Sequence, residues 1–188
     1  HPEPASCHQI QLTYPILSNI ELEKIRHNRL PGLKPVTLPI VYPVAEGSAG
    51  LEAAMERLYR EARHSIAEGC KIIILSDRMI DADHAPIPAL LAVAGLHHHL
   101  VREELRTKAG LVLESGSPRE VHHVALLVGY GVGAINPYLA YEAIHDMIGE
   151  GWLPGTSEAE AERKYARALA KGVVKTMSKM GISTIQSY

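Results

Sequence analysis

Five residues that could carry chemistry follow one short apolar run. The run, residues 72–76 (IIILS), is succeeded within residues 77–84 by Asp77, Arg78, Asp81, Asp83 and His84. Carboxylates and an imidazole so close together could bind a divalent metal ion or act as general acids and bases. Because an unbroken apolar run is typical of a buried parallel strand, the cluster would lie at the strand's carboxyl end, where α/β folds place their active sites.

A simpler interpretation gives these side chains structural roles. Asp77 and Arg78 would form an ion pair, while Asp81 and Asp83 would cap the next helix at its positive end. We favour it because carboxylates are common at strand ends and no further ligand run follows. In the catalytic alternative, Glu114 and Asn136 would join the cluster from neighbouring strand ends.

Histidine and glycine runs elsewhere do not form recognisable sites. Residues 97–99 and 122–123 are consecutive histidines. Consecutive residues on a helix point about 100° apart and cannot converge on one ion, so a metal site would need one histidine from each run. The stretch 129–133 (GYGVG) precedes a predicted strand, whereas a dinucleotide loop follows one, which favours a helix end with close backbone packing. The serines at 76, 115, 178 and 183 lack a nucleophile-elbow context.

The elements that would position these residues alternate between strand and helix. We predict an α/β fold in which short parallel strands alternate with helices through right-handed crossovers, forming an open sheet or a partial barrel. The last residues, 181–188, are apolar enough to begin another strand. The predicted strands are 37–44, 72–76, 110–113 and 131–136, and the predicted helices are 19–27, 51–68, 85–106, 118–130, 137–148 and 158–179.

Composition narrows the class of protein. The 188 residues suffice for one domain with or without an extension, and 46% of them are hydrophobic. A net charge of −2 gives no general attraction to nucleic acid or to an anionic membrane. No apolar run approaches the ~20 residues of a membrane span, and no signal peptide is recognisable. Cys7 and Cys70 are expected to be free thiols in a reducing, cytoplasmic setting. Because the first residue is not Met, we expect a piece of a longer chain.

Three stretches together resemble one known family. Residues 74–144, from ILSDRMIDADHAP to YGVGAINPYLAYEAI, are similar to the central domain of the glutamate synthase large subunit. The opening stretch 7–26 (CHQIQLTYPILSNIELEKIR) and the closing stretch 171–188 (KGVVKTMSKMGISTIQSY) match the same family in the same order. The resemblance divides the chain into the central, connecting domain at 1–154 and the leading segment of the FMN-binding synthase domain at 155–188.

The resemblance implies a role within a larger enzyme. Members of the family make glutamate from glutamine and 2-oxoglutarate, and so assimilate ammonia. An amidotransferase domain with an N-terminal cysteine releases ammonia, and an FMN barrel with a 3Fe-4S cluster reduces the imine. The central domain joins the two, and ammonia passes between them through an internal tunnel. A C-terminal β-helix domain follows, and a small electron-donor subunit or ferredoxin supplies electrons.

None of the family's catalytic parts lies in this chain. Residue 1 is histidine, and Cys7 is not equated with the amidotransferase nucleophile. The three-cysteine motif of the cluster is absent, so no catalytic, cofactor-binding or metal-binding residue is assigned. We therefore expect a connecting domain that is inactive alone, holds two active sites in register and contributes wall to the tunnel. The alternatives are a free-standing α/β enzyme that uses the 77–84 cluster, or a scaffold with exposed apolar docking patches.

Overall fold

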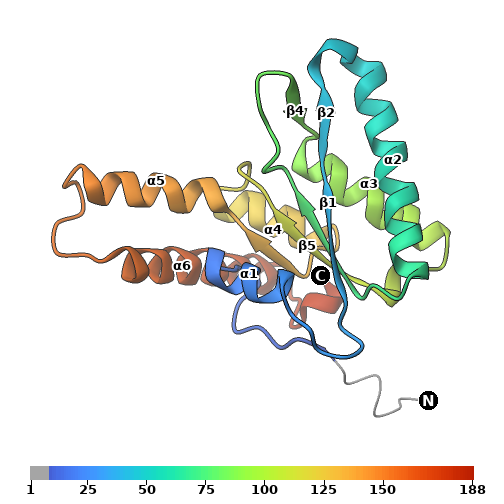
Figure 1. The fold of residues 1–188 in the computed structure, drawn as a ribbon. Coiled ribbons are helices and arrows are strands. Elements are labelled where there is room, and N and C mark those ends of the chain that lie inside the picture. The colour runs from blue at the N-terminus through green and yellow to red at the C-terminus, as the bar shows by residue number, and fades with distance from the viewer. Residues whose placement is uncertain (1–8) are drawn as a thin grey trace.

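The computed structural model, which describes residues 9–188, is built on a four-stranded parallel sheet (Figure 1). The strands neighbour one another in chain order, as they do in an α/β barrel, but β1 and β6 lie at opposite edges and do not pair. The predicted α/β class is therefore confirmed, and the sheet is a sector of a barrel left open. The strands are β1 Pro35–Pro39, β3 Ile72–Ser76, β5 Gly110–Glu114 and β6 Ala134–Asn136.

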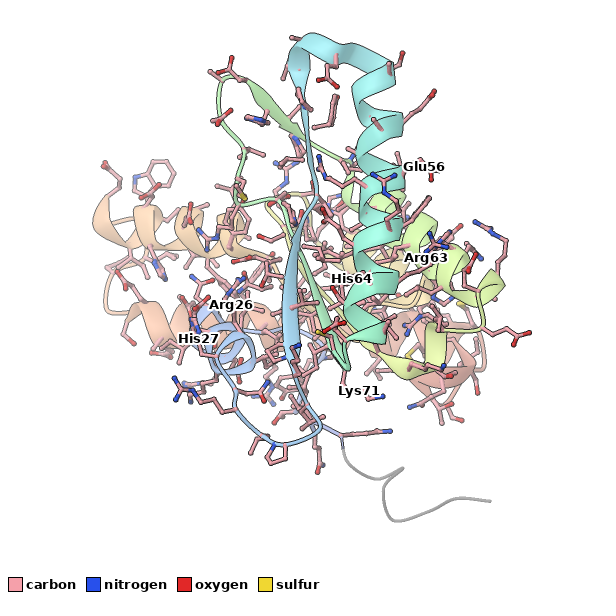
Figure 2. The ribbon with its side chains drawn as sticks, turned by 45° about the vertical axis from the view of Figure 1, so that its right-hand side comes forward. Arg26, His27, Glu56, Arg63, His64 and Lys71 are labelled. Carbon is pink, nitrogen blue, oxygen red and sulfur yellow. The ribbon has the colours of Figure 1, made fainter. Side chains whose placement is uncertain are left out.

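Helices on one face of the sheet form the main core. Leu58 of α2, Leu96 of α3, Val124 of α4 and Val173 of α6 join this core and are at most 2% exposed. The charged side chains of α2, such as Glu56 and Arg63, point away from it (Figure 2). The helices are α2 Gly47–Ala67, α3 Ala89–Arg102, α4 Val121–Gly129, α5 Tyr138–Gly149 and α6 Glu158–Lys179, and single 3-10 turns lie at η2 Val44–Glu46, η3 Arg106–Lys108 and η4 Ile185–Ser187.

One short helix, α1 (Asn19–Arg26), covers the opposite face. It begins at a capping box, in which the Glu21 N–H donates to Ser18 Oγ at 3.2 Å and the Ser18 N–H donates to Glu21 Oε2 at 2.8 Å. Leu22 and Ile25 then pack against Ile74 of β3 and other strand residues in a second, smaller core. In a closed barrel this face would be the interior, so α1 fills the space that the missing strands would enclose.

The segment before α1 extends the sheet at its far edge. Leu17 N–H donates to the Ile135 carbonyl at 2.8 Å, and Ile135 N–H donates to the Pro15 carbonyl at 2.8 Å. Residues 15–17 thus run parallel to β6, with Ile16 forming an isolated bridge to Ile135. The chain leaves this edge, crosses the inner face as α1 and returns at the opposite edge as β1.

The prediction of one strand over residues 37–44 is wrong, because the structure has two strands in this region. β1 ends at Pro39, and β2 (Val41–Pro43) pairs antiparallel with β4 (His84–Pro86), an element that periodicity does not predict. The helix predicted from residue 85 consequently begins only at Ala89, after Pro88 in the cap position. Prolines suit these edge and cap positions because they have no N–H to donate.

Other boundaries shift for local reasons. α2 begins at Gly47 rather than at 51, and α4 begins at Val121 because the Ser117 N–H turns back to Ser115 Oγ at 3.1 Å. The strand predicted from 131 starts at 134, since Gly131 (φ 98°) ends the preceding helix, as expected for the GYGVG stretch. The final residues form η4 rather than a strand. No helix in the described part of the chain has the length and apolarity to span a membrane.

The packing of α1 predicts how stability responds to substitution. Leu22 is 1% exposed and Ile20 is 70% exposed. We expect Leu22→Ala to lower the free energy of unfolding by about 2–5 kcal/mol, because it leaves a cavity between α1 and the sheet. Ile20→Ala, the matched control on the same helix, should change it by less than about 0.5 kcal/mol. Urea denaturation followed by circular dichroism measures both, and equal losses would contradict this packing.

Candidate functional site

Three polar residues end neighbouring strands and face α1. Ser76, Glu114 and Asn136 are register partners across β3, β5 and β6, so their side chains point to the same side of the sheet. All three are at most 5% exposed. They form a buried polar layer at the carboxyl edge, above the apolar layer that packs on α1: Ile74, Val112 and Ala134.

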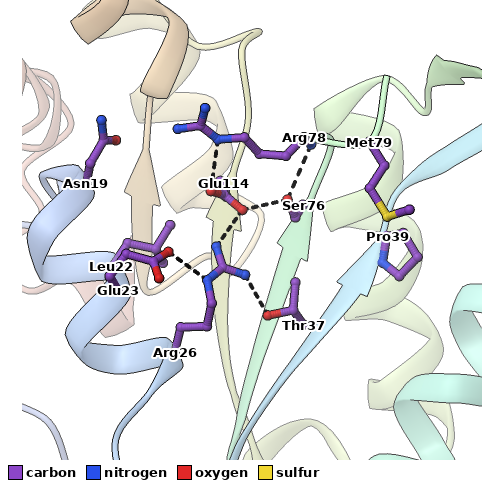
Figure 3. Close-up of a pocket in the computed structure, with 10 residues that line it drawn as sticks. All are labelled: Asn19, Leu22, Glu23, Arg26, Thr37, Pro39, Ser76, Arg78, Met79 and Glu114. Atoms are coloured by element: carbon purple, nitrogen blue, oxygen red, sulfur yellow. Dashed lines mark hydrogen bonds and ion pairs between the residues drawn. The ribbon is translucent and has the colours of Figure 1, made fainter. Parts of the chain in front are cut away.

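Glu114 is the centre of this layer (Figure 3). Its Oε2 accepts hydrogen bonds from Ser76 Oγ at 2.5 Å and from Arg26 Nη2 at 2.7 Å. Its Oε1 accepts from Arg78 Nε at 3.1 Å. Both carboxylate oxygens are therefore engaged, by one hydroxyl and two guanidinium groups.

The two arginines also bind groups beyond Glu114. Arg26 donates to Glu23 Oε1 at 2.8 Å and to Thr37 Oγ1 at 2.7 Å, which joins α1 to β1. Arg78 donates to Glu142 Oε1 at 3.0 Å and lies 3.9 Å above the ring of Tyr138, which joins the end of β3 to α5. Through Glu114 of β5, the network thus connects α1, β1, the end of β3 and α5, which are distant in the sequence.

Burial and hydrogen bonding act in opposite directions on Glu114. Burial raises the pKa of its carboxyl group, but the hydrogen bonds from Ser76 and Arg26 and the charge of Arg26 outweigh this effect. The net result is a pKa below the ordinary value of a glutamate. Glu114 is therefore an ionised, fully engaged carboxylate, and it is poorly suited to accept a proton as a general base.

Asp77 secures the loop after β5. It is 3% exposed and accepts hydrogen bonds from Ser115 Oγ at 2.6 Å and from the Gly116 N–H at 3.2 Å. The predicted Asp77–Arg78 ion pair is therefore wrong, because each residue binds partners from β5 or beyond. Burial, followed by a hydrogen bond with Asp77, raises the pKa of Tyr138.

Asp81 shapes the turn that leads into β4. Its Oδ1 accepts hydrogen bonds from the N–H groups of Asp83 and His84, each at 2.8 Å, and lies 2.9 Å from His84 Nδ1. The Asp83 carbonyl accepts from the Val44 N–H at 2.8 Å. The sequence predicts that Asp81 and Asp83 cap the next helix. This prediction is wrong, because β4 lies between these residues and the start of α3. The five predicted residues divide between the Glu114 network, the Asp77 loop contact and this exposed turn.

Asn136 holds the N-terminal segment. Its Nδ2 donates to the Leu17 carbonyl at 3.1 Å and to Asn19 Oδ1 at 2.9 Å. Its buried Oδ1 has no partner among the described protein atoms. Asn136 thus fixes the segment beside β6 to the start of α1, while Glu114 makes the contacts with the arginines.

A cleft of about 490 Å³ opens beside Glu114. Figure 3 shows the side chains that line it and the dashed contacts among them. Because Glu114 and Arg26 are engaged with protein partners, the cleft has a polar floor but no free acid–base group. Its lining residues are Asn19, Leu22, Glu23, Arg26, Thr37, Pro39, Ser76, Arg78, Met79 and Glu114.

The histidine runs do not form a metal centre. His97 Nδ1 accepts from Arg106 Nε at 3.0 Å, whereas the His99 ring stacks on Tyr59 with ring centroids 4.4 Å apart. Burial, and then the charge of Arg106, lowers the pKa of His97. Within residues 9–188, no group of three or more His, Cys, Asp or Glu side chains could hold a metal ion. Cys70 is a buried free thiol, and Cys7 lies outside the described residues.

Sequence reasoning finds half of the network. Arg78 and Glu114 are recognisable because each follows or ends a predicted strand. Arg26 and Thr37 carry no such signal, because nothing in the sequence places the end of α1 over the carboxyl edge of the sheet. The role of Tyr138 cannot be predicted from the sequence either, because its contact with Arg78 depends on the direction in which α5 leaves β6.

The parallel strands in chain order, with polar residues at their carboxyl ends, define the class of this fold as an open sector of an α/β barrel. Solved α/β barrel structures confirm the class: a flavocytochrome b2 variant with sulfite bound gives a TM-score of 0.54 at 14% identity. A mandelate oxidase variant gives 0.52 at 15% identity. The matches cover 89% and 88% of this chain but only 36% and 41% of those chains. At such low identity the likeness concerns the fold alone.

Sequence comparison identifies the family. The family model described as the glutamate synthase central domain matches residues 1–188. The NADPH glutamate synthase large chain of Bacillus subtilis (strain 168) is 44% identical over all of this chain, and the NADH glutamate synthase of Schizosaccharomyces pombe is 40% identical over 98% of it. The ferredoxin-dependent glutamate synthase of Pyropia yezoensis is 33% identical over 99%. The chain belongs to the glutamate synthase central domain family.

The match covers a small part of each relative. This chain spans 12% of the Bacillus subtilis protein, 9% of the Schizosaccharomyces pombe protein and 13% of the Pyropia yezoensis protein. The relatives are therefore much longer chains in which this fold is one portion. The alternative of a free-standing enzyme built on the 77–84 cluster is not supported.

The Glu114 network predicts a pH-dependent stability. Because the pKa of Glu114 is lowered on folding, its ionised form stabilises the protein above its ordinary pKa of about 4.3, and this contribution is lost as the pH falls through the folded-state value. At neutral pH we expect Glu114→Gln to lower the free energy of unfolding by about 1–3 kcal/mol. The difference from the wild type should shrink below about pH 4.

Glu142→Gln is the matched control. Glu142 also pairs with Arg78, but its side chain is 48% exposed, so the loss should be below about 1 kcal/mol. Chemical denaturation of the three proteins across this pH range measures the effect. A Glu114→Gln loss no larger than that of the control, or one unaffected by acid, would refute the central place given to Glu114.

Proposed function

We propose that this chain is the connecting domain of a glutamate synthase polypeptide that makes glutamate from glutamine and 2-oxoglutarate. Its role is to hold the amidotransferase and FMN synthase sites in register and to contribute wall to the ammonia tunnel. The observation that carries the proposal is the family match over residues 1–188, in relatives of which the chain spans only 9–13%.

The contacts at the strand ends support a structural role rather than a catalytic one. In a barrel enzyme this edge carries the reacting groups. Here the carboxylates of Glu114 and Asp77 accept hydrogen bonds from neighbouring protein groups. The polar layer thus fastens α1, the strand ends and α5 to one another, which suits a domain that must keep a fixed shape between two active sites.

The cofactors proposed for the parent enzyme, FMN and a 3Fe-4S cluster, do not fit the residues of this chain. Two cysteines cannot supply the three thiolates of the cluster motif, and Cys70 is buried. At the strand ends the carboxylates of Glu23, Glu114 and Glu142 surround the two arginines, which disfavours a phosphate group. We therefore place both groups in other domains and derive no step through them.

The partners are the flanking amidotransferase and synthase domains, and a small electron-donor subunit or ferredoxin for the parent enzyme, which we expect to be cytoplasmic. A boundary near residue 154 separates the central domain from the leading segment of the synthase domain. The leading segment nevertheless packs as part of this fold, because Leu169, Val173 and Met177 of α6 belong to the main core.

Activity assays test the proposal. The purified 188-residue chain should show neither glutaminase activity nor amination of 2-oxoglutarate. Either activity, in a preparation free of the parent enzyme, would overturn it.

A variant of the full-length parent tests the register function. Glu114→Gln should lower glutamine-dependent glutamate synthesis more than it lowers glutaminase activity, because a loosened connecting domain uncouples two intact sites. Glu52→Gln, at an exposed position of α2 outside the Glu114 network, should leave their ratio near the wild-type value. Equal ratios in all three proteins would argue against a role in register.

A further inference from the structure

The helices α5 and α6 form an arm that extends away from the sheet (Figure 1). The two helices pack on each other and are joined by residues 150–157. Tyr141 and Tyr165 meet edge to face with ring centroids 5.8 Å apart, and His145 Nε2 lies 2.7 Å from Glu162 Oε1. These contacts fix the arm on the side where its helices face each other.

The outer side of α5 is apolar and uncovered. The buried residues of this helix, Tyr138, Ala140 and Tyr141, all lie in its first four positions, although its sequence is YLAYEAIHDMIG. An apolar row along a helix normally faces a core. The exposed apolar residues recur at a spacing of four and continue into the following turn: Leu139, Ala143, Met147 and then Trp152, of which Leu139 is 47%, Met147 37% and Trp152 70% exposed.

An acidic row runs beside this apolar row. Glu142, Asp146 and Glu150 are exposed, and each follows a member of the first row by three residues, so the two rows are neighbours on the helix surface. Glu142 pairs with Arg78, but within the described part of the chain no lysine or arginine pairs with Asp146 or Glu150. A complementary surface would therefore present an apolar depression bordered by basic side chains.

We propose that Leu139, Ala143, Met147 and Trp152, here called the α5 face, dock against a basic-rimmed apolar surface of another domain of the same longer polypeptide. The inference rests on the proposed function, because it requires the chain to be one portion of a larger protein. The relatives supply the occupant: about nine-tenths of the Bacillus subtilis chain lies outside the region matched here. Tryptophan is among the residue types enriched at the energetic centres of protein interfaces.

Charge argues against a second copy of this chain as the occupant. In a two-fold dimer the same patch meets itself, so the acidic row around Asp146 and Glu150 would approach its own copy. Like charges juxtaposed at an interface are unfavourable. A different, basic surface is therefore the better complement.

Hydrogen–deuterium exchange tests the proposal on the full-length glutamate synthase polypeptide and on the 188-residue chain. We expect peptides covering 138–153 to exchange roughly tenfold more slowly in the full-length protein, because docking suppresses local opening of the arm. Peptides covering β3, which is fully buried in this fold, should exchange alike in both proteins and serve as the internal reference.

The outcomes separate the two proposals. If 138–153 exchanges equally in both proteins while other surfaces of the domain become protected, docking by the α5 face is refuted and the proposed function stands. If no surface becomes protected, the proposed function fails as well. If protection of 138–153 appears in the 188-residue chain and increases with its concentration, the occupant is a second copy and the proposal is overturned.

Two matched variants of the full-length protein sharpen the test. Met147→Glu places a charge in the α5 face and should accelerate exchange of 138–153 by roughly tenfold. Val174→Glu, at a 65% exposed position on α6, should not. Should Met147→Glu fail to fold, Trp152→Ala replaces it, because a 70% exposed side chain contributes little to the fold itself. Unchanged exchange in the folded variant would refute the proposal.

Discussion

The burial of one carboxylate determines how this domain is assembled. Glu114 is 4% exposed, and an ionised group in that position is tolerated only when it is fully hydrogen-bonded. Arg26 and Arg78 meet that requirement from α1 and from the loop after β3, and each arginine extends to a further element. Satisfying this one group therefore sets where α1, β1 and α5 lie relative to the carboxyl edge of the sheet.

The same requirement engages the polar groups at the edge where α/β barrels carry their active sites. In barrel enzymes the residues at the carboxyl ends of the strands act on the substrate. In this domain α1 lies across the inner face and supplies Arg26 to the carboxylate that would otherwise be free. The carboxyl edge is thereby closed by protein contacts in a fold whose relatives carry it as a small fraction of a longer chain.

Much of the architecture follows from local patterns, and the rest depends on distant contacts. The isoleucine run of β3 and the capping box of α1 are readable because their signals lie within a few residues. The β2–β4 pair is not, because each strand has three residues and is stabilised by a partner 41 to 45 positions away, from Pro43 with His84 to Val41 with Pro86. In the same way, Asp77 and Arg78 are recognisable as polar strand-end residues, but their partners are fixed only when β5 lies beside β3.

The pairing of residues 15–17 with β6 has a mechanical consequence. The segment runs parallel to the strand, and its two hydrogen bonds to Ile135 lie across the direction in which the chain enters. A pull from the preceding polypeptide would act on these bonds in shear, so both must stretch together rather than open one after the other. Force applied to residues 15–17 is thereby transmitted to β6, at the edge of the sheet, through two bonds that resist it together.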